Sequence, residues 1–353
     1  MAEERVSDDK EARVISISDG ERRKARRIGA AEIPQGKRRG TRRPSSPGPA
    51  RNRVPSAGSI AVAGDDEIEG LLSGILADPR VGHWIKFMRG RLEGRYAVDK
   101  FGYDEQLASE MFLPFLRVLY HDYFRVEVHG IENVPRRGPA VLAANHSGVM
   151  PIDAAMLLCA IDEEHDDAPV VRTLGSGSIW SLPFISQWVR KTGGVADTHA
   201  DALRLLRDGE VIVSFPEGSK GRGKPFRERY RLQRFENPEF VKVALAERAT
   251  IIPVGIVGAE EAYPMLADAR VLARLFGLSY FALTPTFPWL GPLGMLPLPT
   301  KWIIEFGEPI EMSTYNPEAA QDAMTVFNIA DGVRDTIQQI LYRNLMHRRT
   351  WFW

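Results

Sequence analysis

From residue 125 onward, short hydrophobic runs alternate with segments in which apolar residues recur at helical spacing. The short runs predict β-strands at 125–129, 140–144, 170–174, 211–215, 250–257 and 302–306. The segments between them predict helices at 153–161, 198–207 and 238–248. Strands that alternate with helices in this way predict an α/β fold, in which a mostly parallel sheet is flanked by helices on both faces.

The chain before residue 125 is predicted to contain amphipathic helices. Apolar residues at helical spacing between 68 and 76 place the start of order near Asp65. A surface helix is expected within 84–103, weakened by two glycines. The next segment, 104–124, has an apolar arc wider than one core-facing stripe, and Pro114 is expected to kink or end its helix. Two interpretations remain for this helix: packing on the sheet, or lying in a membrane interface.

The stretch 272–299 is strongly apolar, yet it cannot form one continuous helix. Its single charge is Arg274, and five prolines interrupt it. It is either an apolar loop packed on the domain or an exposed patch that docks into lipid or lines an acyl-chain groove, and the second is favoured. A terminal helix is expected at 319–346. The last residues, 347–353, join cations to aromatic side chains, which suits an interfacial anchor and equally a loose tail.

The 353-residue chain has a formal net charge of zero, but the charge is unevenly distributed. Residues 1–60 contain 15 Lys or Arg against 8 Asp or Glu, and the remainder contains 31 against 38. Because the basic segment is also rich in Pro, Gly and Ser, residues 1–64 are expected to form a disordered arm. The arm is either a solvated tail or is drawn to anionic lipid. Nucleic acid is not expected as a partner, because no aromatic residue lies between Met1 and Ile60.

Cysteine content and apolar run lengths limit the setting in which the protein works. The single cysteine, Cys159, excludes an intrachain disulfide, fits a reducing compartment and is expected to be a core residue. The N-terminus lacks the apolar core of a signal peptide, and no apolar run reaches the ~18 residues of a spanning helix. Three parts are therefore predicted: the arm at 1–64, an amphipathic, membrane-proximal helical segment at 65–124, and an α/β domain at 125–353.

Three short blocks follow or lie within the predicted strands. The first, 145–153, reads Asn-His-Ser-Gly-Val-Met-Pro-Ile-Asp, and the second, 215–220, reads Phe-Pro-Glu-Gly-Ser-Lys. The third, 251–256, is a strand that contains Pro253. The strand ends place the polar residues of the first two blocks on the rim of the sheet.

In this order, the blocks resemble the glycerolipid acyltransferases of the lysophosphatidate acyltransferase superfamily, over roughly residues 125–310. Acyl transfer to an alcohol needs a base for the hydroxyl proton and donors for the oxyanion. The resemblance implies that His146 is the base and Asp153 its partner, in what would be an acyltransferase domain at 125–353. Backbone donors near Gly148 or Gly218 are expected to hold the oxyanion, and Pro253 to shape the acyl pocket.

The spacing within the first block departs from the family pattern. The superfamily usually has His-x4-Asp, whereas this chain has His146-x6-Asp153, with Pro151 at the usual Asp position. Residues seven apart on one helix lie about 10.5 Å apart along its axis, which is too far for contact. The pairing therefore requires a loop at 147–150, with Pro151 as the first helical residue. The looser spacing resembles the monoacylglycerol/diacylglycerol acyltransferase-like branch. The alternatives are a structural His146 and an Asp153 that merely caps the helix.

Acceptor binding is implied for the second block and for one residue between the first two. The residues concerned are Glu217, Gly218, Ser219, Lys220, Arg222 and Lys191. The family usually has an arginine where Lys220 stands. Lysine lacks the bidentate fork of arginine, so recognition of a phosphate is weakened but is retained as a prediction.

The sequence therefore predicts an O-acyltransferase, peripheral on the cytoplasmic, inner face of a membrane. It would move a fatty acyl group from acyl-CoA or acyl carrier protein to a hydroxyl of a (lyso)glycerophospholipid or related glycerolipid. No cofactor or metal is expected, because the remaining histidines lack metal-ligand spacing. One alternative is an acceptor without phosphate, such as a mono- or diacylglycerol, an alcohol or a glycolipid. The other is a non-catalytic, membrane-binding member of the fold. Acceptor, acyl-chain length, carrier and oligomeric state stay open.

Overall fold

The computed structural model describes residues 79–147, 150–175, 180, 184–235, 238–275 and 281–352. The predicted disordered arm and the helix expected at 68–76 lie outside these residues. The chain divides into two units, Met1–Ala97 and Val98–Trp353, so the predicted segment 65–124 spans the division. In the first unit, α3 (Pro79–Leu92) overlaps the range 84–103 where a surface helix was expected, but it begins five residues earlier, and the chain turns after it at Gly94 (φ +71°).

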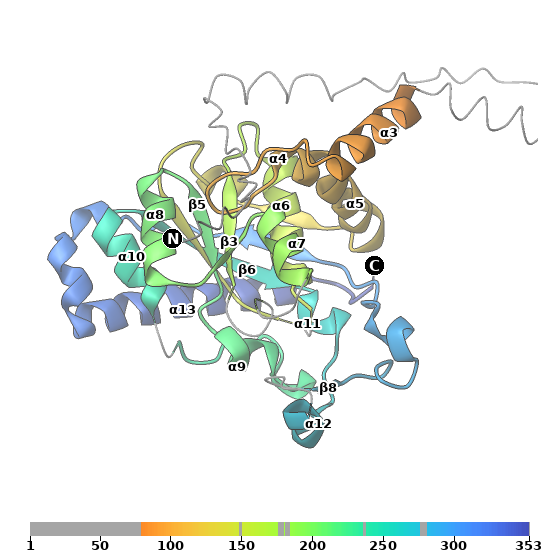
Figure 1. Ribbon diagram of the computed structural model, residues 1–353. Coiled ribbons are helices and arrows are strands. Elements are labelled where there is room, and N and C mark those ends of the chain that lie inside the picture. Colours follow the sequence, from red (N-terminus) through yellow and green to blue (C-terminus); the bar gives the residue numbers. More distant parts are fainter. Residues whose placement is uncertain are drawn as a thin grey trace, which may run out of the picture. The chain divides into compact units, whose positions relative to one another are not determined.

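In the second unit, residues 105–123 form one unbroken helical run, which carries the labels α4 and α5 in Figure 1. Its parts are α4 (Glu105–Leu107), the π-helical turn η1 (Ala108–Phe112), α5 (Leu113–Val118) and the π-helical turn η2 (Leu119–Tyr123). Of the two outcomes expected at Pro114, a kink or an end of the helix, the end is wrong, because the helical run continues to Tyr123. The N–H of Leu113 bonds to the carbonyl of Ala108, five residues back, and Pro114 follows in the first turn of α5.

A seven-stranded sheet forms the centre of the second unit, within the residues that are described. Its strands are β1 (Glu127–His129), β2 (Ala140–Ala144), β3 (Val171–Gly175), β4 (Gly194–Ala196), β5 (Val211–Ser214), β6 (Thr250–Val257) and β9 (Ile303–Phe306). The order is β1-β9-β6-β2-β5-β3-β4, and β6 pairs with β9 antiparallel while all other neighbours are parallel. The mostly parallel sheet of the sequence analysis is therefore confirmed.

Alternate side chains of the strands fill two separate cores, one on each face of the sheet. On β2, Val141 and Ala143 belong to one core, and Leu142 with its alternate neighbours belongs to the other. The first core is closed by α8 (His199–Arg207), α10 (Glu239–Glu247) and α13 (Ala323–His347). The second is closed by α6 (Ile152–Glu164) and by Leu116 and Tyr120 of the run 105–123. This run therefore packs one side on the core, which leaves Phe115 exposed on the other.

The predicted helices 153–161, 198–207 and 238–248 correspond to α6, α8 and α10. Thr198 caps α8 by accepting a hydrogen bond from the Asp201 N–H, and Gly209 (φ +74°) follows its end. The elements that the prediction missed are short: α7 (Ile185–Lys191), β4, α9 (Gly218–Arg222), α11 (Ala259–Ala262) and η6 (Gly291–Met295). Segments of this length do not develop a clear hydrophobic period.

One edge of the sheet collects the chain segments that carry polar residues. Because β2, β5 and β6 are parallel, the residues that follow them leave the sheet at the same edge, here termed the carboxyl edge. Figure 1 places α9, α11, α12 (Arg270–Leu275) and β8 (Ala282–Leu283) on this side of the sheet. The chain returns from there into β9, which explains why β9 runs antiparallel to β6.

Candidate functional site

His146 and Asp153 are in direct contact at the carboxyl edge. Nδ1 of His146 lies 2.7 Å from Oδ2 of Asp153. α6 begins at Ile152, so Asp153 is on its first turn and points back at the ring. The described residues before it, Ser147, Met150 and Pro151, are non-helical, and the helix starts one residue later than expected. Asp153 does more than cap: the same Oδ2 accepts from the Ser147 N–H at 2.9 Å.

The surroundings of this pair fix the orientation of the imidazole. The ring stacks on Phe215, with ring centroids 4.4 Å apart and planes inclined by 29°. Asp153 is fully enclosed, while the side chain of His146 keeps 10% of its surface exposed. A carboxylate can only accept hydrogen bonds, so Nδ1 acts as the donor and Nε2 is left as the proton acceptor. The ring thus presents a basic nitrogen from a fixed position.

Asn145 fixes the start of the loop that carries His146. Its side-chain amide donates to the carbonyl of Ile256 at 3.0 Å and accepts from the same residue's N–H at 2.7 Å. These two bonds continue the pairing of β2 with β6 one residue beyond the ladder. Because Asn145 is fully buried, both bonds are shielded from water and the loop leaves the sheet in one direction.

Glu217 contacts the same loop from the other side. It follows β5, and Gly218, which begins α9, has φ +56°. Oε1 of Glu217 accepts from the backbone N–H of His146 at 3.2 Å, and Oε2 accepts from the Gln233 N–H at 2.7 Å. Glu217 is 4% exposed, so it holds the main chain and does not face solvent. The expectation that Glu217 contacts the acceptor directly does not fit this enclosed position.

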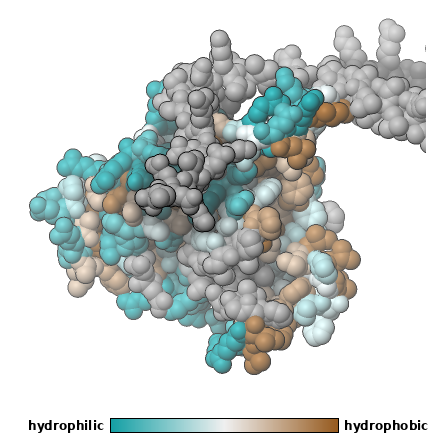
Figure 2. All heavy atoms as spheres, viewed as in Figure 1, coloured by the Kyte–Doolittle hydropathy of each residue, from teal (hydrophilic) through white to brown (hydrophobic). Residues whose placement is uncertain are grey.

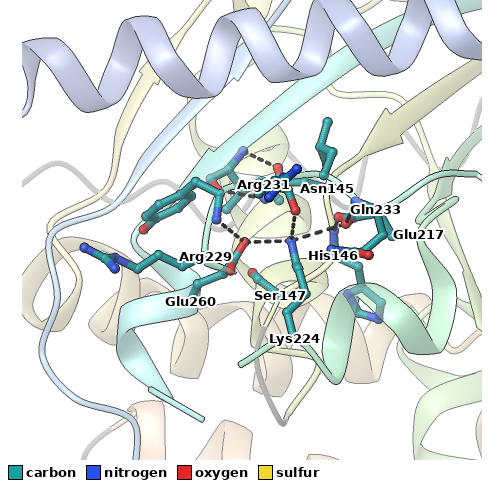
Figure 3. A network of polar contacts seen from close by, with 12 residues as sticks. Asn145, His146, Ser147, Glu217, Lys224, Arg229, Arg231, Gln233 and Glu260 are labelled. Carbon is teal, nitrogen blue, oxygen red and sulfur yellow. Dashed lines mark hydrogen bonds and ion pairs between the residues drawn. The ribbon is translucent and has the colours of Figure 1, made fainter. Parts of the chain in front are cut away.

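Lys224 sits between two buried carboxylates. Its ammonium lies 3.2 Å from a carboxylate oxygen of Glu217 and 3.2 Å from one of Glu260, a residue of α11. The ammonium also donates to the Arg231 carbonyl at 3.3 Å. Figure 3 shows this ammonium between the two carboxylates, with the imidazole of His146 pointing away from the network. We term Glu217, Lys224 and Glu260 the lysine cluster. A single cation for two carboxylates leaves an excess negative charge inside the protein.

The excess charge sets the protonation of the lysine cluster. Burial raises the pKa of Glu260, Lys224 opposes this shift and Glu217 adds to it, and together these effects bring the pKa to about 7. Burial by itself would lower the pKa of Lys224, but the two carboxylates outweigh it and the pKa is raised. The ammonium therefore stays charged, and Glu260 is the group that takes up a proton near neutral pH.

The remaining predicted site residues are placed less directly. Lys220 is exposed on α9, and the side chains of Ser219 and Arg222 lie outside the described residues, as does Gly148. The N–H of Gly218 donates to the Phe215 carbonyl at 2.9 Å. That backbone donors near Gly148 or Gly218 hold the oxyanion stays a prediction. Lys191 ends α7 shortly before β4 begins, at the amino end of the outermost strand. The fold does not bring it to His146.

The sequence analysis missed the partners inside the lysine cluster. Nothing in the sequence marks Glu260 as a neighbour of Lys224, or Gln233 as a neighbour of Glu217. The only signal was position: Glu260 follows the end of β6, as His146 and Glu217 follow β2 and β5. Cys159 behaves as predicted, since it is fully buried on α6 and burial raises the pKa of its thiol to about 12.

The described residues contain no group of His, Cys, Asp and Glu side chains arranged to hold a metal ion. Among these same residues, no helix has both the length and the apolar character needed to cross a bilayer.

Comparison with known proteins places this geometry in a family. Residues 125–257 match the family model described as Acyltransferase, a range that contains His146, Asp153 and Glu217. An uncharacterized protein of Mycobacterium leprae is 50% identical over 266 residues, which cover 75% of this chain and 72% of that protein. A Bos taurus protein named "DGAT1/2-independent enzyme synthesizing storage lipids" is 22% identical over 223 residues, which cover 63% of this chain and 60% of the relative.

Among solved structures, the 1-acyl-sn-glycerophosphate acyltransferase of Thermotoga maritima aligns with a TM-score of 0.46 and 17% identity. The alignment covers 68% of this chain and 80% of that chain. The family match spans the β2 loop, the β5 loop and β6, which are the segments that build the site. The chain therefore belongs to the family described as Acyltransferase, with residues 125–257 as the matched part.

Proposed function

We propose that the protein transfers a fatty acyl group from a thioester to a hydroxyl of a glycerolipid, with His146 as the general base. The observation that carries the proposal is the 2.7 Å contact between Nδ1 of His146 and Asp153. It leaves Nε2 free of the carboxylate and able to take the proton of an acceptor hydroxyl. Asp153 stabilises the imidazolium that forms, as a buried carboxylate does in other His-based acyl transfer.

In this mechanism the acceptor oxygen attacks the thioester carbonyl carbon while its proton passes to Nε2 of His146. The tetrahedral intermediate collapses and expels the thiolate, which takes the proton back from the imidazolium. The products are an ester and a free thiol, and no covalent enzyme intermediate or cofactor is needed. Acyl-CoA and acyl carrier protein both supply such a thioester, so either is a suitable donor.

The acceptor is proposed to bind beside α9, where Lys220 is exposed. A lysophospholipid would meet a point charge there, without a bidentate fork. One observation favours a second candidate, an acceptor without phosphate. Lys224, the nearby cation that could have reinforced Lys220, is held inside the lysine cluster with a side chain 3% exposed. The storage-lipid synthesis named for the Bos taurus relative also supports a neutral glycerolipid or alcohol acceptor.

The protein is proposed to work at the cytoplasmic face of a membrane as a peripheral enzyme. Its acceptor class is insoluble in water, and the basic arm at 1–64 would be attracted to anionic lipid. Attachment without a spanning helix is then enough to bring the enzyme to its substrate.

The proposal is tested by incubating the purified full chain with labelled acyl-CoA, or with labelled acyl carrier protein, and a panel of lipid acceptors. We expect an ester product with the wild type that is lost in His146→Ala. His199→Ala is the matched control, because His199 is an exposed histidine that also contacts a carboxylate, Glu239. Equal transfer by wild type and His146→Ala would remove His146 as the base. Silence with every donor and acceptor would favour a non-catalytic lipid-binding protein.

The same panel separates the two acceptor classes. Lys220→Ala is expected to weaken transfer to a lysophosphatidate and to leave transfer to a monoacylglycerol unchanged. A wild type that uses only neutral acceptors, with no effect of Lys220→Ala, would establish the second candidate in place of the first.

A further inference from the structure

Between α11 and β9 lies a long apolar segment that includes α12, β8 and η6; its described residues, 263–275 and 281–299, are here termed the apolar excursion. It is tied to the core near both of its ends. The hydroxyl of Tyr263 donates to the Met295 carbonyl at 2.9 Å, and the N–H of Leu298 donates to the Ala262 carbonyl at 2.8 Å. Tyr123, from the helical run 105–123, donates to the Pro297 carbonyl at 2.6 Å. These bonds hold the excursion in place at the carboxyl edge.

The apolar excursion turns large hydrophobic side chains toward solvent. Seven of them are between 59% and 80% exposed: Leu266, Val271, Leu275, Trp289, Leu290, Leu293 and Leu296. Figure 2 shows hydrophobic surface gathered along the side where Figure 1 draws α12 and the blue segment that includes η6. Single exposed hydrophobic residues are ordinary, but a concentration of this kind in one loop marks a surface that meets lipid or another protein.

Exposed cations lie on the excursion and on the segments that contact it: Arg270 and Arg274 on α12, Arg227 on the loop after α9, and Arg349 after α13. Two of them pair with acids, Arg270 with Asp268 at 3.4 Å and Arg227 with Glu228 at 3.7 Å, which leaves Arg274 and Arg349 as the excess positive charge. A surface that joins apolar and aromatic groups to an excess of cations is complementary to the headgroups and acyl boundary of an anionic bilayer. A second copy of the chain would bring the same positive charge and be repelled.

The excursion is also joined to the proposed active site. The N–H of Phe226, two residues after Lys224, donates to the Met265 carbonyl at 2.7 Å. The rings of Phe226 and Trp351 are 5.8 Å apart, so the C-terminal segment packs on the same loop. Lys301 N–H donates to the Trp351 carbonyl, which fixes this tail instead of leaving it loose. The loop of the lysine cluster, the tail and the excursion thus form one connected surface at the carboxyl edge.

We propose that the apolar excursion is the surface on which the protein docks to an anionic lipid bilayer. This inference rests on the proposed function for its meaning: docking there turns the carboxyl edge, with His146, toward the membrane. A lipid acceptor then reaches the site from the bilayer surface without crossing water. The interpretation of 272–299 as an exposed lipid-docking patch is thereby extended to a defined set of side chains and to an orientation of the whole domain.

The test is sedimentation of the full chain with vesicles of phosphatidylcholine alone or mixed with phosphatidylglycerol. The test variant carries Leu290→Ser and Leu293→Ser, on the excursion. The control carries Met324→Ser and Phe327→Ser. Both side chains are also exposed, but they lie in the first turns of α13, whose other end leads to the carboxyl edge. Binding is compared at low salt and at about 0.5 M salt, because salt screens the basic arm far more than it weakens apolar contacts.

We expect the test variant to bind mixed vesicles at least tenfold more weakly than the wild type at the higher salt, and the control to bind like the wild type. Equal binding by all three would overturn the proposal. It would also be overturned by a wild type that is dimeric without lipid and becomes monomeric in the test variant, since the surface would then be an interface between copies.

Transfer between a short-chain thioester and a water-soluble alcohol, measured without vesicles, separates this proposal from the enzymatic one. The test variant should keep its rate there and lose rate only on acceptors held in vesicles. A wild type that binds vesicles as expected but never transfers an acyl group would contradict the proposed function and leave the docking surface standing.

Discussion

Two buried carboxylates hold His146, one through its side chain and the other through its backbone. Asp153 contacts the ring at Nδ1, whereas Glu217 accepts from the backbone N–H of the same residue. The Asp153 side ends at an imidazole that still reaches solvent. Glu217 instead contacts Lys224, which contacts Glu260, and all three side chains are buried. One region orients a reactive group, and the other orients the chain that carries it.

The two regions also differ in the charge of the groups that contact each carboxylate. Asp153 contacts an imidazole nitrogen and the backbone N–H of Ser147, and no second carboxylate is among these contacts. The lysine cluster holds a permanent ammonium between two carboxylates, which is a structural arrangement that costs several kcal/mol if one partner is lost. The comparison predicts that changes on the Asp153 side reduce rate with little loss of stability, and that changes in the lysine cluster reduce stability first.

The largest effect is expected for Asp153→Asn. Asparagine keeps an acceptor for the Ser147 N–H, but it no longer stabilises an imidazolium and it permits the wrong ring tautomer. We expect the acyl-transfer rate to fall by about 10³- to 10⁴-fold, with a much smaller change in the free energy of unfolding. The rate is measured with saturating donor and acceptor, and urea unfolding is measured in parallel. A near-normal rate would reduce Asp153 to a helix cap.

Lys224→Met should instead act on stability. Removing the ammonium leaves two buried carboxylates without a cation, which is expected to lower the free energy of unfolding by about 3–5 kcal/mol. Urea unfolding measures this loss, and Lys220→Met on the exposed part of α9 is the control, with an expected change within about 0.5 kcal/mol. Adding Glu260→Gln to Lys224→Met should restore part of the stability. Failure of the double variant to recover any would argue against the charge balance described for the cluster.

Glu260→Gln should change the pH dependence of stability. Burial raises the pKa of Glu260 to about 7 from its ordinary value of 4.5, so the folded protein holds this proton more tightly than the unfolded chain. The resulting stabilisation is complete below about pH 4.5 and is lost as the pH rises through about 7. The wild type should therefore lose roughly 3 kcal/mol more than the variant across this window. Urea midpoints at a series of pH values measure it, with Glu228→Gln as the control. Parallel curves for wild type and Glu260→Gln would contradict the assignment.

A smaller effect, on both regions together, is expected for Gly221→Ala. A Cβ at this position of α9 would come within 2.7 Å of the Glu217 Cβ and 3.0 Å of the His146 carbonyl. To relieve this overlap, Glu217, the loop that carries His146, or both must shift. We expect the shift to cost about 1–3 kcal/mol in stability and to lower the acyl-transfer rate. Gly332→Ala is the matched control, because nothing lies within 4 Å of its Cβ position on α13 and alanine favours a helix. If both variants behave alike, α9 does not couple the two regions.

The strands and longer helices were predictable because their signals are local. The run 140–144 and the run 250–257 coincide with β2 and β6, since both are apolar segments buried on both faces. The short elements α7, α9 and β4 were missed, as they depend on their neighbours for stability. The helix was wrongly expected to end at Pro114. A π-helical turn lies directly before α5, and the helical run continues through Pro114.

The sequence by itself determined the order of most strands and longer helices, the presence of a histidine and an aspartate near one strand end, and the presence of a Glu-Gly-Ser loop near another. These features follow from periodicity and from motifs that lie close together along the chain. Only the tertiary structure decided that Asp153 reaches the ring of His146, and that Lys224 is an internal counter-ion. Contacts between residues separated by 36 or 71 positions, such as Lys224 with Glu260 or Glu217 with His146, depend on which strands become neighbours in the sheet. No local pattern encodes that choice.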